Sequence, residues 1–238
     1  MTITVDDGRC AARSGAHSPL PAVPAAARVE VLRFLAAYAY SPSGVDPPSR
    51  RSRRLCAAIK AADPEALAAG ARTIAGFVRG GTDWAAYLDR DAVLVPVPAS
   101  VPRPMDETHV SAGIAAALVH CGIGADVREL LVRAVPVRKS ATAPIGARPS
   151  VAEHFASLRI IQAPVEPAVA GLVLVDDVVS RGRTLLAAAC RLRERFPQTP
   201  IVALALMRTL GYVTALPRLA APCAGEIRWR RGDAVRTR

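Results

Sequence analysis

Three runs of consecutive apolar residues mark the chain, at residues 92–97, 171–175 and 201–207. A strand that helices cover on both faces is apolar at nearly every position, so each run predicts a buried strand of a parallel sheet. Segments with helical spacing lie among these runs, at residues 109–121 and 184–196. The alternation predicts an α/β fold, with a mostly parallel sheet and helices on both of its faces.

The flanking segments add further elements. Apolar residues at helical spacing predict a helix over residues 28–40. Asp63-Pro64-Glu65 is a helix start with an N-cap, a proline at the first position and an acid in the first turn, so a second helix should cover residues 63–78. Residues 130–137 predict a strand, and residues 158–161 predict one strand of a small hairpin.

Changes in composition along the chain suggest four parts. We expect a flexible leader at 1–24, an N-terminal helical segment or hood at 25–90, the core at 91–215, and a basic C-terminal tail at 216–238.

Composition makes the core aliphatic and the surface rich in arginine. Hydrophobic residues make up 51% of the chain and aromatic residues only 4%. Lysine occurs twice, at Lys60 and Lys139, so 29 of the 31 basic residues are arginine. The net charge of +11 favours anionic ligands and leaves nucleic acid open as a partner. The arginines of residues 50–54 fit a solvated helix face, which we favour, or an anion or nucleic-acid contact.

Cysteine usage and the N-terminus indicate the compartment. The five cysteines form no Cys-x-x-Cys pair, so zinc-site spacing is absent, and we expect reduced, mostly buried thiols. Residues 1–10 carry acids and no apolar segment of a signal peptide. No run of about 18 apolar residues exists to span a membrane. These features predict a cytoplasmic protein with no membrane partner.

Residues 172–184 carry the candidate chemistry. Four apolar residues lead into Asp176 and Asp177, and the chain then bends through a glycine-containing turn at residues 180–184 into a helix. Such a turn exposes unpaired N–H groups at the positive end of the helix dipole, which makes a phosphate cradle. Gly182 lacks the Cβ that would keep a phosphate from the backbone. The two carboxylates can accept hydrogen bonds from the neighbouring hydroxyls of a ribose whose 5′-phosphate lies in the turn.

These thirteen residues resemble the phosphoribosyl-pyrophosphate (PRPP) motif of the type I phosphoribosyltransferases. The resemblance implies a type I phosphoribosyltransferase-like core with a small variable hood. It also implies that PRPP is bound by Asp176, Asp177, Val178, Val179, Ser180, Arg181, Gly182, Arg183 and Thr184. Arg181 departs from the small hydroxyl residue usual at its position. Two adjacent acids at a strand end also occur in response-regulator-like phosphorylation sites and in simple Mg²⁺ sites.

The segment Val95–Ser100 occupies the place of the pyrophosphate loop in this superfamily. Its Val-Pro-Val-Pro sequence is most similar to the ComF-like branch, the competence-associated phosphoribosyltransferases, and weaker similarity runs through residues 40–42 and 58–60. The cysteine-rich zinc ribbon that many ComF-like proteins carry is missing. The resemblance makes Pro98, Ala99, Ser100 and Arg103 the candidates for binding pyrophosphate. Pro96 and Pro98 equally fit simple termination of a strand.

Arg138-Lys139 resembles the pair that opens the mobile catalytic loop of orotate- and adenine-type enzymes. In a chain that uses arginine nearly everywhere, a lysine can persist because a compact, mobile ammonium is needed. The candidate catalytic residues are therefore Lys139, Arg138, Asp176 and Asp177. The long stretch 141–157, with Arg148, Glu153 and His154, is typical of a lid. A lone loop histidine is more often incidental, and Tyr212 fits either stacking on an acceptor base or packing.

The predicted function is pentosyl transfer by a glycosyltransferase of nucleotide metabolism. In a parallel sheet, the loops after residues 97, 137 and 175 should converge on one ligand. The resemblance implies PRPP and a small-molecule base as substrates and Mg²⁺ as cofactor, with Asp176 and Asp177 mainly in its outer sphere. The alternative is a non-catalytic PRPP or nucleotide sensor, or a DNA-uptake accessory protein, that binds nucleic acid. A PRPP synthetase shares the motif but would carry a second similar domain, and the sequence shows no internal repeat. The sequence does not set the oligomeric state, and a homodimer stays open.

Overall fold

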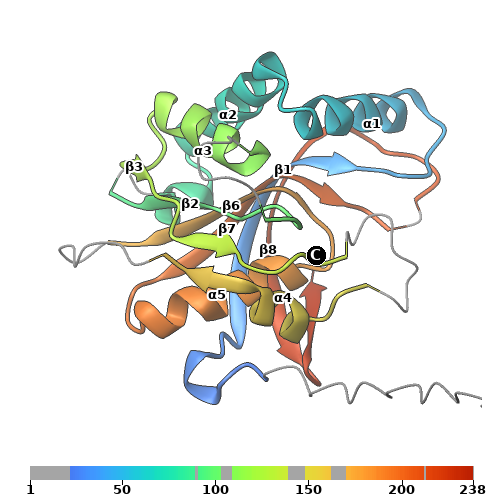
Figure 1. Ribbon diagram of the computed structural model, residues 1–238. Coiled ribbons are helices and arrows are strands. Elements are labelled where there is room, and N and C mark those ends of the chain that lie inside the picture. The colour runs from blue at the N-terminus through green and yellow to red at the C-terminus, as the bar shows by residue number, and fades with distance from the viewer. Residues whose placement is uncertain are drawn as a thin grey trace, which may run out of the picture.

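The computed structural model describes residues 22–88, 91–102, 109–138, 148–161, 170–211 and 213–237. Its centre is a seven-stranded sheet in the order β3-β2-β6-β7-β1-β8-β9 (Figure 1). The first five strands of that order are parallel, and β8 and β9 add an antiparallel pair at one edge. The strands are β1 Val31–Tyr40, β2 Val93–Pro96, β3 Asp126–Val127, β6 Leu172–Val179, β7 Ile201–Thr209, β8 Ala220–Arg230 and β9 Asp233–Thr237. The predicted α/β fold with a mostly parallel sheet is confirmed.

Helices cover both faces of this sheet, as Figure 1 shows. One face carries α1 Pro47–Lys60, α2 Pro64–Arg79 and α3 Val110–His120, and the other carries α4 Val151–Ser157 and α5 Arg183–Arg195. Short 3₁₀ helices lie at η1 Ala25–Ala27 and η2 Asp83–Ala86. The helix starts follow the sequence signals: the Asp63 side chain caps α2 by accepting from the N–H of Ala66 at 2.8 Å.

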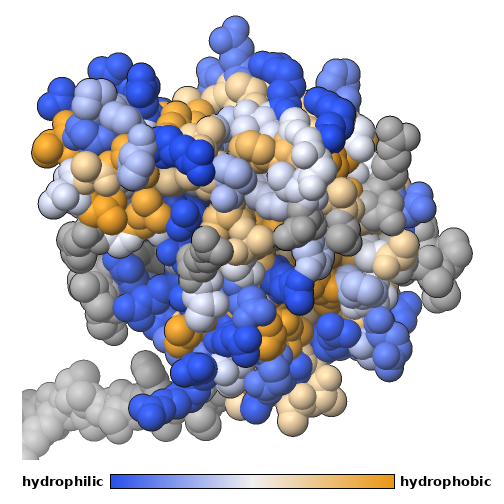
Figure 2. Space-filling view, turned by 180° about the vertical axis from the view of Figure 1, so that it is seen from behind, coloured by the Kyte–Doolittle hydropathy of each residue, from blue (hydrophilic) through white to orange (hydrophobic). Residues whose placement is uncertain are grey.

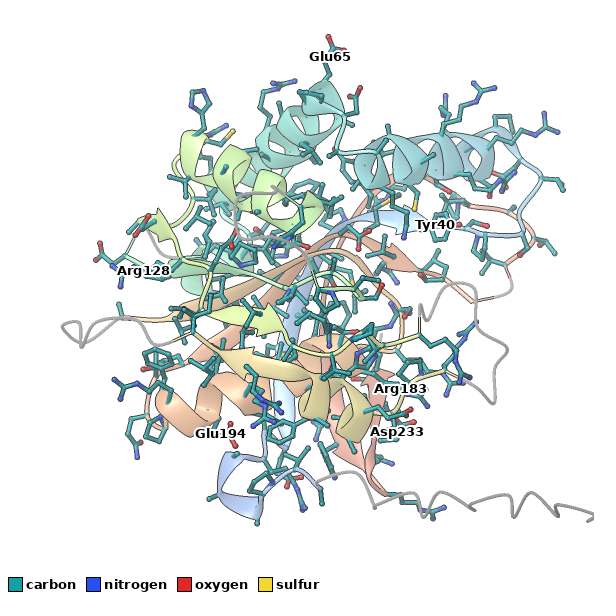
Figure 3. The ribbon with its side chains drawn as sticks, viewed as in Figure 1. Tyr40, Glu65, Arg128, Arg183, Glu194 and Asp233 are labelled. Atoms are coloured by element: carbon teal, nitrogen blue, oxygen red, sulfur yellow. The ribbon has the colours of Figure 1, made fainter. Side chains whose placement is uncertain are left out.

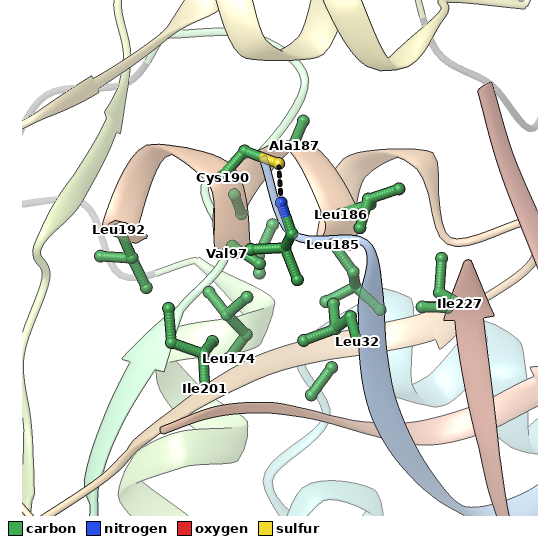
Figure 4. Close-up of a cluster of buried hydrophobic side chains, with 14 of the residues drawn as sticks. Leu32, Val97, Leu174, Leu185, Leu186, Ala187, Cys190, Leu192, Ile201 and Ile227 are labelled. Atoms are coloured by element: carbon green, nitrogen blue, oxygen red, sulfur yellow. Dashed lines mark hydrogen bonds between the residues drawn. The ribbon is translucent and has the colours of Figure 1, made fainter. Parts of the chain in front are cut away.

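Each face of the sheet has its own hydrophobic core. In β6, Leu172 and Leu174 pack on the α4–α5 side, whereas Val173 and Val175 pack on the α1–α3 side. This alternation follows from the two-residue period of a strand. In the α4–α5 core, the N–H of Val29 donates to the buried sulfur of Cys190 at 3.4 Å (Figure 4). The four described cysteines are free thiols, and Cys56, Cys190 and Cys223 are buried, as the sequence predicts.

The helix that we expect over residues 28–40 is wrong, because Val31–Tyr40 forms strand β1. This strand lies inside the sheet, between β7 and β8. Its side chains, including Leu32 and Leu35, enter the two different cores. A segment that is apolar at consecutive positions meets helical spacing by chance, and burial on two faces outweighs the helix propensity of its alanines.

Two other expectations change in detail. The strand expected over residues 130–137 is only β4 Leu131–Arg133, and it pairs with β5 Leu158–Ile160 in a separate two-stranded antiparallel sheet. The strand predicted at 158–161 is therefore confirmed, but its partner β4 is separated from it by a segment that includes α4, so the two do not form a small hairpin. The segment expected as a basic tail contributes β8 and β9 to the main sheet. Both β1, from the expected hood, and this pair thus share one sheet with the strands of the expected core.

One face of the protein carries polar and apolar side chains together. Figure 2 shows hydrophilic side chains over much of the face opposite to the view of Figure 1, with apolar side chains among them. Within the described ranges, no helix has both the length and the apolar character needed to cross a membrane.

Candidate functional site

The carboxyl ends of β2 and β6 open onto a cavity of about 370 Å³, which we call the large cavity. A second, small cavity of about 50 Å³ lies beside it, over the turn between β6 and α5. Asp176 and Thr184 line both cavities, so the two spaces adjoin. The large cavity is lined by Lys60, Val97, Pro98, Ala99, Ser100, His109, Val110, Ser111, Arg133, Arg138, His154, Asp176, Asp177 and Thr184. The three predicted loops, after residues 97, 137 and 175, all contribute to this lining.

The turn at residues 180–184 forms the floor of the small cavity. Gly182 is the N-cap of α5 in the left-handed conformation, with a φ of 83°, and no side chain caps the helix. The first N–H groups of α5 therefore have no partner in their own helix. Ser180, Arg181 and Thr184 also line the small cavity, so the residue types of a phosphate cradle come together here.

Glycine is needed at position 182 for a reason other than the one we expect from the sequence. A Cβ at this position would meet the side chain of Ile227 at 2.5–2.9 Å, so it would point toward β8. The positive φ adds a second requirement for glycine. Packing of the turn against the sheet and its backbone conformation, rather than the approach of a ligand, thus account for Gly182.

The guanidinium of Arg183 holds the turn to two neighbouring segments. Its guanidinium donates to both carboxylate oxygens of Asp233 in β9, and the two side chains point toward each other in Figure 3. It also donates to the carbonyls of Arg148 and Pro149 at 3.2 Å each. The Arg183 side chain therefore joins the turn to β9 and to the segment before α4.

The two valines of the motif belong to the scaffold. Val179 is buried in the α4–α5 core, and its carbonyl accepts a hydrogen bond from Arg236 of β9 at 3.0 Å. Val178 packs against the α1–α3 core on the opposite face. These contacts fix the end of β6 from which the turn departs.

Asp176 and Asp177 lie in the second half of β6 and extend toward opposite faces of the sheet, since they are neighbours in a strand. Asp177 Oδ2 lies 3.4 Å from the Nζ atom of Lys60, the last residue of α1. Burial and the neighbouring charge of Asp177 raise the pKa of Asp176 well above its ordinary value. Burial tends to lower the pKa of Lys60, but the nearby Asp177 carboxylate raises it above its ordinary value. The two acids therefore have distinct environments.

Arg133 supports the expected pyrophosphate loop, and the motifs in the sequence do not single it out. It is 5% exposed, and its Nε atom donates to the carbonyl of Ala99 at 2.9 Å. It also donates to the carbonyl of Pro98 at 3.4 Å and to the hydroxyl of Ser157 at 2.5 Å. Burial lowers the pKa of Arg133 to about 10, so the guanidinium stays charged at neutral pH. An arginine flanked by apolar residues in a short strand is the signal that could have indicated it.

His154 lies in α4 and is 3% exposed, so it is not a residue of an exposed loop. Its Nε2 atom is 3.4 Å from the hydroxyl oxygen of Thr184, and no described residue pairs with its Nδ1 atom. Burial and the nearby Arg133 cation lower the pKa of His154 to about 4, so the ring is neutral at pH 7. A capping box between Ser150 and Glu153 fixes the start of its helix.

The remaining predicted residues divide into two groups. Pro98, Ala99, Ser100 and Arg138 line the large cavity together with the two acids. The N–H of Val137 donates to the carbonyl of Ser100 at 2.8 Å, which joins two of the converging loops. Lys139, Arg103 and Tyr212 lie outside the described residues.

The donor set at the end of β6 suits a hard cation that brings most of its own ligands. Asp176 and Asp177 supply carboxylate oxygens to the large cavity. Among the described residues, no group of three or more potential metal ligands occurs. Two acids fit Mg²⁺, which usually keeps several waters and takes phosphate oxygens from the substrate. Residues 176 and 177 could hold such an ion mainly through its water ligands.

Comparisons with known proteins do not place this chain in a family. No protein-family model matches the sequence, and no curated protein matches it either.

Proposed function

We propose that the protein is a phosphoribosyltransferase that binds PRPP with Mg²⁺ and transfers the phosphoribosyl group to a nitrogenous base or related acceptor. One observation carries the proposal: a single continuous stretch places two acids and a helix-starting turn on two adjoining cavities. The small cavity has the donors for a 5′-phosphate, and the acids beside it can accept hydrogen bonds from a ribose diol. The large cavity then takes the diphosphate and the acceptor.

The proposed reaction breaks the bond between ribose C1 and its diphosphate oxygen, and the electron pair leaves with pyrophosphate. The acceptor nitrogen forms the new bond to C1 and loses a proton to solvent. A Mg²⁺ ion held at Asp176 and Asp177, mainly through its water ligands, would supply positive charge to balance that of the diphosphate. Asp176 and Asp177 hold the ribose in place, and the Pro98–Ser100 loop, held by Arg133, positions the leaving group. Arg138 lies at the edge of the same cavity, next to Lys139.

A screen of pyrophosphate release tests the proposal. The protein is incubated with PRPP, Mg²⁺ and a panel of bases and amines, and we expect at least one acceptor to accelerate the release of pyrophosphate. Absence of release with every acceptor, together with absence of PRPP binding in calorimetry, would remove the assignment.

The second candidate is binding of nucleic acid without catalysis. Arg50, Arg51 and Arg54 are exposed on α1, and the net charge of the chain is +11. Contacts of these cations with phosphates would be strongly dependent on salt. Binding of a labelled oligonucleotide that weakens steeply with salt, in a protein that does not bind PRPP, would favour this candidate.

A further inference from the structure

Lys60 lies in the large cavity although it belongs to no part of the phosphate turn or the expected pyrophosphate loop. It ends α1, whose C-terminus reaches the carboxyl end of β6. Its ammonium is 3.4 Å from Asp177 Oδ2, and the residue lines the same cavity as Pro98, Ala99 and Ser100. A cation from a distant segment thus faces the space that the diphosphate would occupy.

The ion pair of Lys60 and Asp177 is suited to exchange its partner. The Lys60 side chain is 49% exposed and that of Asp177 is 23% exposed, so water screens their attraction. The ammonium sits on a flexible four-carbon stem, so it can move without displacement of the helix. An anion that enters the cavity would find a cation within reach of small side-chain rotations.

Arg133 has a different task in the same cavity. Its guanidinium donates to Pro98, Ala99 and Ser157, so its donors already hold the loop. Moving this buried group onto a ligand would release the loop that is expected to hold the same ligand. Lys60 is also one of only two lysines among 31 basic residues. The rarity of lysine is consistent with a requirement for a compact and mobile charge at this position.

We propose that Lys60 is a substrate-binding residue whose ammonium pairs with Asp177 in the free protein and contacts the diphosphate of bound PRPP. Asp177 is then free to accept a hydrogen bond from the ribose. This inference rests on the proposed binding of PRPP, and it assigns to α1 a part of the charge neutralisation that Mg²⁺ supplies.

The test compares two ligands that differ in the diphosphate. Titration calorimetry of Lys60→Met should show PRPP binding about tenfold weaker than in the wild type, because one charged contact is lost. Binding of ribose 5-phosphate, which lacks the diphosphate, should change by less than about twofold. Lys60→Gln should behave in the same way, and the unfolding curves of both variants verify that they fold. Arg54→Met, an exposed change on the same helix, is the matched control and should bind both ligands as the wild type does.

Each other outcome is decisive. Equal PRPP binding in wild type and both Lys60 variants would overturn the role of Lys60 while leaving the proposed function intact. Equal weakening of PRPP and ribose 5-phosphate would also overturn it, because Lys60 would then act only by orienting Asp177. If the wild type binds no PRPP, the proposed function and the role of Lys60 both fail.

Discussion

The two adjoining cavities have walls that are built in opposite ways. We call residues 176–184 the turn wall, and we call Pro98–Ser100, Arg133, His154 and Lys60 the assembled wall. The turn wall is one continuous stretch of chain, and its shape comes from backbone conformation at Gly182 and from packing of Val179. The assembled wall joins four segments through side chains, chiefly the hydrogen bonds of Arg133 to the loop after β2.

This difference determines how each wall responds to change and how well a sequence reveals it. A continuous wall depends on local geometry, so its residue types recur at a fixed spacing and can be recognised. An assembled wall depends on a few buried polar groups whose loss leaves several partners unsatisfied. We therefore expect substitution of Arg133, a buried polar member of the assembled wall, to cost more stability than a change in the turn wall.

The largest effect should come from Arg133→Met. The change removes a buried guanidinium that donates to the carbonyls of Pro98 and Ala99 and to the hydroxyl of Ser157. Because these acceptors lose their partner, we expect a loss of about 4 kcal/mol in the free energy of unfolding. Urea denaturation measures it. Arg193→Met is the control, because its hydrogen bond to the carbonyl of Pro197 is exposed, and it should change stability by less than about 0.5 kcal/mol. Equal effects of the two substitutions would refute the bracing role of Arg133.

The next effect concerns the pH dependence of stability through His154. Its pKa is 6.5 ordinarily and about 4 in the folded protein, because the ring is buried beside a cation. Between these values the unfolded chain binds a proton that the folded protein does not bind, so stability falls as the pH drops from 6.5 to 4. His154 accounts for up to about 3 kcal/mol of this loss in the free energy of unfolding, and none of the loss occurs above about pH 6.5.

Urea denaturation over that pH range should show a shallower acid loss in His154→Gln than in the wild type. His120→Gln, an exposed residue at the end of α3, is the control and should keep most of the wild-type slope. A slope for His154→Gln that matches the wild type would contradict burial of a neutral His154 in the wall.

The smallest of the three effects is expected in the turn wall, from Gly182→Ala. The left-handed φ and the close side chain of Ile227 should together cost about 2 kcal/mol of stability. Gly211→Ala is the control, because a methyl group added at position 211 would meet no described atom within 4 Å beyond its chain neighbours, and the φ there is not positive. Equal stability of the two variants would mean that the turn adapts freely, and the distinction between the walls would be lost.

The sequence predicts much of the fold where one pattern dominates. Strands β2, β6 and β7 begin with apolar runs, and α2 starts at an N-cap aspartate followed by proline, so both kinds of element are found near their expected positions. Strand β1 was missed because its apolar residues satisfy two periods at once, and only its place in the sheet decides between them. Strands β8 and β1 are far apart in the sequence, so no local pattern predicts that they pair.

The candidate site divides in the same manner. Asp176, Asp177 and the turn follow one another in the chain, so their spacing is visible in the sequence. Arg133 and Lys60 are separated from them by more than 40 residues, and only folding brings them to the cavity. The role of His154 depends on its burial in α4, which a single histidine in the sequence does not reveal.

The central claim is that a sugar phosphate binds across the turn wall, with Asp176 and Asp177 at its diol. The most direct measurement is titration calorimetry with PRPP and Mg²⁺ on the wild type and on the double variant Asp176→Asn/Asp177→Asn. We expect the wild type to bind and the folded double variant to bind at least about 100-fold more weakly. Equal affinity in the two proteins, or absence of binding in the wild type, would contradict the account.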